Sequence, residues 1–254
     1  MNQDTRLVFA GLSLLIAGGF MAGPSTADTT LVYNQDHNSG AYTMRVRAGE
    51  ARVDFAGEWQ LYRESENALY IVNPPDESYL RIGLEDAEAI QTEMEQARTE
   101  LARELERMAE HSPQLRARLE AFRAFDQAGD HSRFRAEAMD EKGSIANFEC
   151  RYFRVYLNDQ AIQRLCLATP EAAKISQAEF DTLTAMFTFL NAVFDDSDFE
   201  QMGLPFLELG GIPLSYGESH ARGQERVLDS VSQQPIGEDV FTLPKNYRRE
   251  SPPP

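Results

Sequence analysis

A series of short strands joined by tight turns, in residues 41–82, determines the fold class of this chain. At its start, Tyr42, Met44 and Val46 alternate with polar or charged residues, which is the period-2 pattern of a half-buried strand. Further apolar segments follow at short intervals and are separated by turn residues such as Gly and Pro. Consecutive short strands with close turns predict an antiparallel sheet rather than parallel strand–helix–strand units.

The first hairpin of this sheet is predicted in most detail. Gly49 and the residue after it can form a two-residue turn with Gly at the first central position. That register places Val46 opposite Val53 and Met44 opposite Phe55, all on one face. Charged side chains share the other face, so both strands of the hairpin agree on which side is apolar.

Two segments have helical periodicity instead. Residues 84–125 are rich in Glu, Arg, Ala and Leu, and we interpret them as a kinked helix or helical hairpin inserted into the sheet. Their apolar stripe consists of Ile90, Met94, Ala97, Leu101, Leu105 and Met108. Residues 177–194 have a wide apolar face, and Ser176 and Glu179 before and within them have capping-box spacing. This second segment predicts a core helix that packs on the sheet.

These segments together predict an α+β protein with one domain over residues 28–247. Such a length is sufficient to bury a core without depending on disulfides. The helical insertion is predicted at residues 84–140. Residues 248–254 are predicted as a disordered tail.

The N-terminal residues 1–27 have the organisation of a secretory signal peptide. Arg6 supplies a positive charge, residues 7–22 form an uncharged apolar run, and Ser25 and Ala27 are small residues at the positions that a signal peptidase reads. We therefore predict cleavage after Ala27, a periplasmic or secreted protein, and no transmembrane span in the mature chain. The alternative is an uncleaved anchor, although the run is shorter than the roughly 20 residues of a spanning helix.

The charge of the chain limits its partners. Its formal net charge is −17, with 41 acidic and 24 basic residues. A surface with this excess repels phosphate backbones and anionic lipid headgroups. We therefore expect no nucleic-acid partner and no electrostatic docking on membranes.

The two cysteines, Cys150 and Cys166, predict a disulfide bond because exported proteins fold in an oxidising compartment. Both lie in predicted strands of one hairpin with turn residues at 158–159. A three-residue loop places Cys150 directly opposite Cys166, whereas a two-residue loop places the sulfurs on different faces. The disulfide therefore predicts the three-residue loop, and a pair of free buried thiols is the alternative.

No pattern of catalytic or metal-ligating residues stands out. The four histidines are His37, His111, His131 and His220. They are far apart in sequence and lack ligand spacing, and the common hydrolase, zinc and phosphate-binding motifs are absent. We therefore predict a protein that is not an enzyme, with no catalytic residues, no cofactor and no metal.

One set of apolar residues is the candidate binding surface, because it would line one face of a curved sheet. It consists of Tyr42, Met44, Val46, Val53, Phe55, Leu61, Tyr70 and Val72. Under one interpretation these residues are an ordinary core beneath the helix at 177–194. Under the other they line a partly open groove for an acyl chain or a similar apolar ligand, since such sites are concave and mostly apolar.

Several segments in a fixed order carry a resemblance to a known family. They are residues 46–55 (VRAGEARVDF), 69–82 (LYIVNPPDESYLRI), 145–155 (IANFECRYFRV), 211–214 (GIPL) and 241–247 (FTLPKNY). This order resembles the uncharacterised DUF4412 family, whose fold is thought to be similar to that of the outer-membrane lipoprotein carrier LolA and its relatives. The resemblance covers most of the mature chain and departs at residues 84–140, where the insertion is longer than expected.

The resemblance implies a half-open antiparallel barrel closed by helices, exported and without catalytic residues. It also implies an apolar partner, a lipid or a lipidated protein, held in the concave face, although no individual ligand residue can be transferred. The competing hypothesis is an interaction module in which residues 84–126 dock a protein partner or a second copy of the chain.

Overall fold

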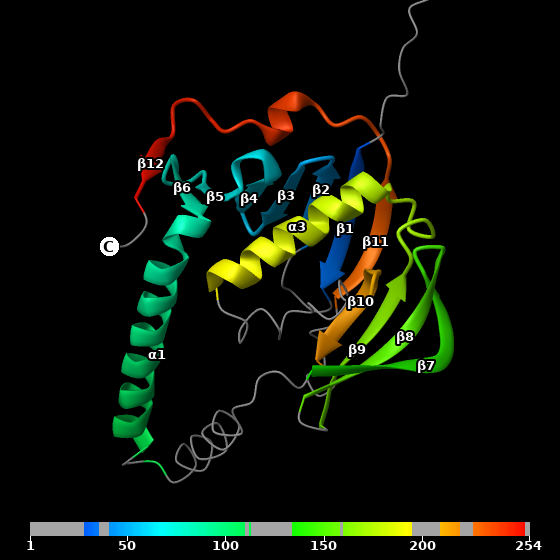
Figure 1. Ribbon diagram of the computed structural model, residues 1–254, viewed down its shortest axis with the longest axis horizontal. Helices are drawn as coiled ribbons and strands as arrows, with labels where there is room; N and C mark the ends of the chain where they lie inside the picture. The colour runs from blue at the N-terminus through cyan, green and yellow to red at the C-terminus, as the bar shows by residue number, and fades with distance from the viewer. Residues whose placement is uncertain are drawn as a thin grey trace, which may run out of the picture.

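The computed structural model describes residues 28–35, 41–109, 112, 134–157, 160–194, 209–218 and 226–251. The predicted signal peptide, residues 113–133 of the predicted helical insertion, and residues 252–254 lie outside these ranges. Within them the protein is an α+β structure dominated by a single sheet (Figure 1).

The strands and helices have the following bounds. The first six strands are β1 (Thr29–Gln35), β2 (Tyr42–Arg47), β3 (Glu50–Phe55), β4 (Glu58–Arg63), β5 (Ala68–Asn73) and β6 (Ser78–Gly83). The other six are β7 (Phe134–Ile145), β8 (Phe148–Leu157), β9 (Gln160–Ala168), β10 (Ile212–Glu218), β11 (Arg226–Ser232) and β12 (Arg248–Glu250). The helices are α1 (Ala87–Ala109) and α3 (Gln177–Phe194), with short 3-10 turns η1 (Glu64–Glu66), η2 (Leu84–Asp86) and η4 (Glu238–Phe241).

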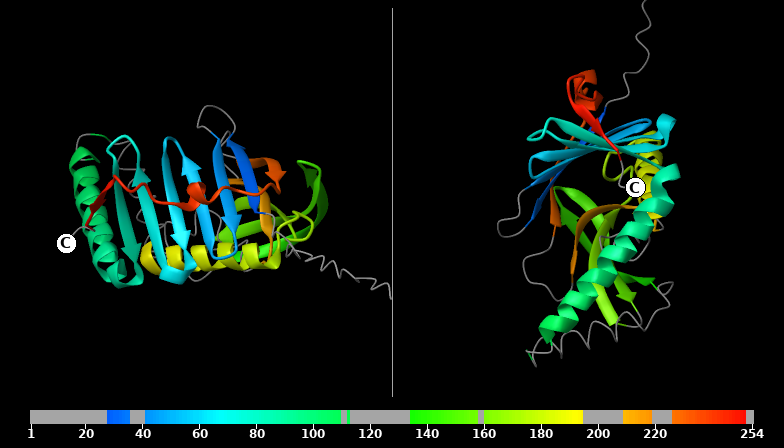
Figure 2. Two further views of the ribbon diagram at one scale, coloured as in Figure 1. Left: turned by 90° about the horizontal axis from the view of Figure 1, so that it is seen from above. Right: turned by 90° about the vertical axis from the view of Figure 1, so that its left-hand side faces the viewer.

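The sheet is open, and its strands are antiparallel except at one end. The strand order is β12-β6-β5-β4-β3-β2-β1-β11-β10-β9-β8-β7, and β12 pairs with β6 in parallel. The antiparallel pairing of the other strands confirms the predicted antiparallel sheet. Because β12 and β7 are the two ends of the strand order, the sheet does not close into a barrel. Strands β7–β9 turn away from the plane of β2–β6, so the sheet is strongly curved (Figure 2).

The β2–β3 hairpin has the predicted faces but a different register. Arg47 pairs with Glu50, so the turn lies one residue earlier than predicted, with Gly49 at a φ of 83° in its second central position. Met44 consequently lies opposite Val53 rather than opposite Phe55. The correction shifts the pairing by two residues, and a shift of two leaves every side chain on its predicted face.

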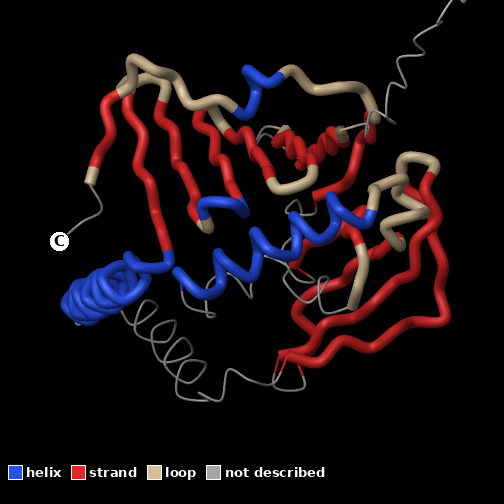
Figure 3. Tube along the Cα trace, turned by 45° about the horizontal axis from the view of Figure 1, so that its top comes forward, coloured by secondary structure: helices blue, strands red, loops and turns tan. Residues whose placement is uncertain are grey.

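The main core lies on the concave face beneath α3, which runs across the strands (Figure 3). The helix begins where predicted, because Ser176 and Glu179 form the expected capping box. The Glu179 backbone N–H donates to Ser176 Oγ at 3.3 Å, and Glu179 Oε2 accepts from the Ser176 backbone N–H at 2.8 Å. Leu183, Met186 and Leu190 then bury one face of the helix against the sheet.

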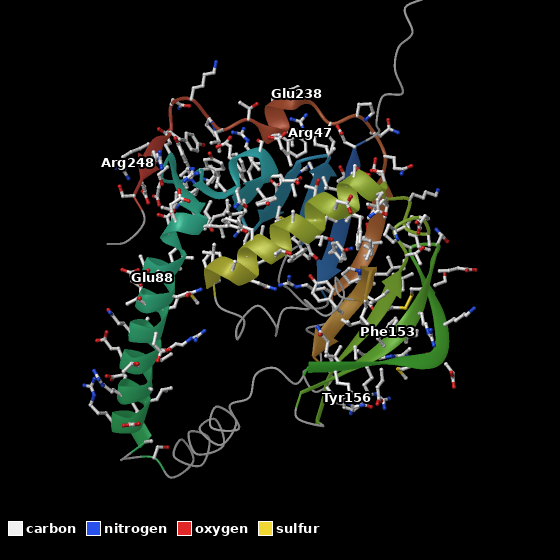
Figure 4. All side chains as sticks on the ribbon, in the orientation of Figure 1. Arg47, Glu88, Phe153, Tyr156, Glu238 and Arg248 are labelled. Atoms are coloured by element: carbon white, nitrogen blue, oxygen red, sulfur yellow. A yellow bond between two sulfur atoms is a disulfide. The ribbon has the colours of Figure 1, made fainter. Side chains whose placement is uncertain are left out.

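A second core lies on the opposite, convex face beneath residues 236–247. Phe241, which is buried, packs there against Trp59 and its neighbours, and arginines hold the covering segment in place. Arg47 pairs with Glu238 at 2.7 Å (Figure 4) and lies over the Phe241 ring, 4.4 Å from its centre. Arg63 donates to the Phe241 carbonyl at 2.8 Å. Both faces of β3–β5 are therefore covered.

Two predicted boundaries need correction. Residues 134–140, predicted as part of the helical insertion, belong to β7, which pairs with β8. Their many charged residues are typical of an edge strand, which is protected from further pairing by charge, and they hid the strand pattern. Residues 248–250, predicted as disordered tail, form β12 against β6. In the described part of the chain no helix is both long and apolar enough to cross a bilayer.

Candidate ligand-binding cavity

A cavity of about 280 Å³ lies between α3 and the concave face of the sheet. Its size is close to the lower limit of about 300 Å³ that is usual for small-molecule sites. The residues that line it are Leu31, Tyr33, Tyr42, Met44, Val53, Phe55, Glu58, Trp59, Gln60, Leu183, Met186, Phe187, Leu190, Ile212, Pro213, Tyr216 and Arg226. Only Glu58 and Arg226 are charged, so the wall is overwhelmingly apolar and aromatic.

Strand and helix periodicity place these side chains. Tyr42 and Met44 are two apart on β2 and therefore point to the same side of the sheet. On α3, Leu183, Phe187 and Leu190 recur at spacings of four and three and so share one helical face. Phe55, at the end of β3, both lines the cavity and is 47% exposed, so this part of the wall is in contact with solvent.

Half of the predicted apolar face lines this cavity. Tyr42, Met44, Val53 and Phe55 are brought together there by β2 and β3. Val46 points to the same side but is fully buried in the core and does not line the cavity. These five positions share a face as predicted.

The other three predicted residues, Leu61, Tyr70 and Val72, lie on the opposite face, and that part of the prediction is wrong. Leu61 pairs with Arg52 and Tyr70, and all three side chains belong to the convex side, where the apolar ones join the second core. The error has a physical cause. Both faces of strand β4 are buried, so apolar side chains occur at both its odd-numbered and its even-numbered positions. Alternation alone therefore does not identify which of these side chains lie on the concave face.

A hydrogen-bonded cluster of polar groups lies at the β10–β11 end of the cavity. The Tyr42 and Tyr216 hydroxyls are 2.6 Å apart and hydrogen-bonded. The Tyr33 ring stacks on Tyr42 with ring centres 4.7 Å apart, and its hydroxyl donates to the Pro213 carbonyl at 2.9 Å. Arg226 donates to the Tyr216 hydroxyl at 3.4 Å, and its guanidinium carbon lies 5.2 Å from the centre of the Tyr42 ring.

Burial keeps these phenols protonated. It raises the pKa of Tyr33, and the neighbouring Tyr216 raises it further. Burial is also the main cause of a pKa of Tyr42 well above the ordinary 10.0, although the Arg226 charge opposes this shift. Both hydroxyls are therefore neutral and able to donate hydrogen bonds at any physiological pH.

Sequence reasoning singled out Tyr42 but missed its partners Tyr33, Tyr216 and Arg226. The four residues come from strands β2, β1, β10 and β11, and the Tyr42–Tyr216 bond spans 174 positions. No short-range pattern signals such a contact. The available signal was weaker: residues 31–34, 212–216 and 225–231 have the composition of short strands, but nothing in these segments indicates that the strands are neighbours.

The predicted disulfide is confirmed, but the predicted loop is wrong. Cys150 and Cys166 are bonded, with their Cα atoms 5.5 Å apart. Leu157 pairs with Gln160, which is the register of a two-residue loop. A β-bulge between residues 155 and 156 then shifts the pairing by one, so that Cys166 lies opposite Tyr152 and returns to the face of Cys150.

The predicted interaction stripe on α1 is only partly covered. Ile90 is buried and Met94 packs against the main core, whereas Leu101 is 59% exposed and Met108 is 46% exposed. Gln91 donates to the carbonyl of Ala192 at 3.1 Å, which ties the start of α1 to α3. From there α1 extends away from the sheet (Figure 1).

The four histidines all lie outside the described residues. In the described ranges, no three side chains of His, Cys, Asp or Glu gather in a way that could hold a metal ion. The predictions of no metal, no cofactor and no catalytic residue stay predictions.

Comparison with known proteins adds no function. No known family matches this sequence, and no curated protein matches it either. Among solved structures it is similar to an uncharacterised conserved protein from Thermus thermophilus, at 7% identity over 90% of this chain and 92% of the other, with a TM-score of 0.42.

Two further structures have lower similarity. PNGF-II aligns at 7% identity over 89% of this chain and 32% of its own, with a TM-score of 0.37. MucB, solved in complex with MucA(peri), aligns at 10% identity over 87% of this chain and 55% of its own, with a TM-score of 0.34. With all scores below 0.5, the function has to be argued from the residues of this chain.

Proposed function

We propose that this chain is an exported, non-enzymatic protein that binds an apolar ligand in the cavity beneath α3. The observation that carries the proposal is the cavity of about 280 Å³ with its apolar and aromatic wall. Concave apolar cavities with a few polar groups are the usual form of a small-molecule site. The order of sequence segments that resembles the DUF4412 family, whose fold is thought to be similar to that of LolA, implies the same role.

Export is part of this proposal. The Cys150–Cys166 bond is compatible with a periplasmic or extracellular location, because disulfides persist in oxidising compartments. Expression with the native N-terminus, followed by fractionation and intact-mass measurement, tests the expectation. Periplasmic protein that begins at Asp28 supports export, whereas full-length protein in the cytoplasm contradicts it.

Native mass spectrometry of protein purified gently from the periplasm tests ligand binding. We expect a reproducible extra mass that solvent extraction releases as a lipid or another apolar compound. A bare polypeptide mass that stays unchanged after incubation with fatty acid, phospholipid or lipopeptide would overturn the proposal.

A cavity-filling variant makes the test specific to the site. Val53 is half-buried and lines the cavity, so the larger side chain of Val53→Trp should lower the fraction of protein that carries the extra mass of the ligand. Val240 is also half-buried but belongs to the second core on the convex face, so Val240→Trp is the matched control. Equal loss of ligand from both variants would place binding elsewhere.

The exposed end of the α1 stripe favours a second candidate function, docking of a protein partner or a second copy. Leu101 is 59% exposed and Met108 46% exposed, and their spacing of seven places them on one face of α1. The double variant Leu101→Glu/Met108→Glu should then dissociate an oligomer or partner, measured by light scattering, and leave cavity binding unchanged. A wild-type monomer without partners would contradict this candidate.

A further inference from the structure

Arg226 differs in its partners from five other partly buried arginines of the sheet. Arg45, Arg47, Arg52, Arg63 and Arg81 are also partly buried, and each forms an ion pair with a carboxylate. In the described ranges, no carboxylate lies within ion-pair distance of Arg226, whose neighbours are tyrosines. In a chain with a net charge of −17, a partly buried guanidinium that has no carboxylate partner among the described residues points to an anion supplied from outside.

The groups around Arg226 have more hydrogen-bond donors than acceptors. One of the two hydroxyls, Tyr42 or Tyr216, donates to the other, which leaves one O–H of the pair without an acceptor in the described chain. The guanidinium has five N–H donors, of which one is directed to Tyr216. A ligand that completes this cluster must therefore accept hydrogen bonds, and a carboxylate accepts several.

The rest of the cavity requires the same ligand to be apolar. From β11 the wall continues over β1 and β2 to β3, a distance of about 14 Å at the usual strand spacing. Met44, Val53 and Phe55 line this part of it. The small volume suits one hydrocarbon chain rather than several. Glu58, the other charged residue, lies beyond β3 and would repel a carboxylate, which sets the head of the ligand at Arg226.

We propose that Arg226 and the hydroxyl pair of Tyr42 and Tyr216 bind the carboxylate of a single-chain fatty acid whose tail occupies the cavity. This inference rests on the proposed function and names its ligand class. The hydrocarbon tail provides the binding energy common to all apolar chains. The cluster at Arg226 provides selectivity for an anionic headgroup. A planar carboxylate suits it because two carboxylate oxygens can accept hydrogen bonds from the two parallel N–H groups of the guanidinium.

Titration calorimetry of the purified protein with three 12-carbon probes tests the inference: dodecanoate, dodecanol and dodecyltrimethylammonium. We expect wild-type protein to bind dodecanoate about ten- to a hundredfold more tightly than dodecanol, since hydrogen bonds to a charged group contribute that much. Arg226→Gln should reduce the dodecanoate affinity to that of dodecanol and leave dodecanol unchanged. Arg226→Lys, which keeps the charge but not the fork, should give an intermediate affinity.

Arg154→Gln is the matched control, because Arg154 is exposed on β8 and its loss changes the net charge equally. It should leave all three affinities unchanged. If wild-type protein binds dodecanol or the ammonium probe as tightly as dodecanoate, the inference is overturned while the cavity remains a binding site. If it binds none of the probes, the proposed function fails as well. Because the comparison of probes on wild-type protein needs no variant, a folding defect in Arg226→Gln does not affect it.

Discussion

Val46 and Phe55 lie on the same face of the first hairpin but differ in what surrounds them. Val46 is fully buried, whereas Phe55 is 47% exposed at the rim of the cavity. Val46→Asp should lower the free energy of unfolding by at least about 3 kcal/mol, because it buries an unpaired charge. Phe55→Asp should change it by less than about 1 kcal/mol and still weaken binding of an apolar ligand.

Urea unfolding followed by a binding assay on the folded variant checks both expectations. The Phe55→Asp variant is informative about ligand binding only because it stays folded. Equal destabilisation by both substitutions would show that Phe55 belongs to the core and not to the entrance of a site.

Glu66 should make the stability of the protein depend on pH. A hydrogen bond from the Tyr70 hydroxyl is the main cause that lowers the pKa of Glu66 below its ordinary 4.5, burial opposes the shift, and Arg63 adds to it. Since the folded pKa is lowered, the stabilisation is present above pH 4.5 and is lost as the pH falls through the lowered pKa. Glu66→Gln should therefore be less stable than wild type at pH 7, and the difference should vanish in acid.

Urea unfolding at a series of pH values from 7 to 3 measures this difference. Glu64 in the same turn is the control, because its carboxylate makes no hydrogen bond or ion pair in the described part of the chain. Glu64→Gln should follow wild type at every pH. A gap between wild type and Glu66→Gln that persists undiminished at pH 3 would contradict the assignment.

The β8–β9 hairpin should depend on its disulfide. Cys150 and Cys166 are both buried and lie 16 positions apart, and a loop of about this length contributes roughly 3 kcal/mol by restricting the unfolded chain. The double variant Cys150→Ala/Cys166→Ala should therefore unfold with about that loss, measured in urea. Wild-type protein treated with a reductant should match the variant. Unchanged unfolding would show that the other strand pairings alone hold the hairpin.

The same hairpin shows how far sequence could predict the fold. The number of cysteines and the expected oxidising compartment predicted the bond, because neither depends on the strand register. The bulge at residues 155–156 was not predictable, since a one-residue insertion has no necessary composition signal. Strand β7 was missed for a related reason: an edge strand does not need an apolar face, and its pairing with β8 is what makes it a strand.

In the candidate site, too, the residues that local sequence patterns could predict differ from those that depend on distant parts of the chain. Periodicity placed Tyr42, Met44 and Val53 on one face because a hairpin is a local structure. It failed at Leu61, where the convex face is also buried, because the covering segment near Phe241 comes from a distant part of the chain. The Arg226 cluster depends entirely on the strand order β2-β1-β11-β10, which only the complete sheet defines.

Because the cavity is built jointly by the sheet and α3, a bound ligand should stabilise the fold that creates it. A ligand that binds only the folded state adds about 2.7 kcal/mol at a free concentration of 100 times its dissociation constant. For a domain of about the size predicted for residues 28–247, such a gain raises the melting temperature by about 5–10 °C.

Differential scanning calorimetry with increasing dodecanoate measures this shift. We expect the melting temperature to rise with the logarithm of the free dodecanoate concentration, and the rise to be smaller for Arg226→Gln at each concentration because its affinity is lower. Dodecanol should give wild type and Arg226→Gln the same shift, since it has no charge for the guanidinium to bind. A melting temperature that stays constant, or falls, over concentrations that saturate the calorimetric titration would mean that the ligand binds the unfolded chain as well as the folded one, and the cavity would then not be its site.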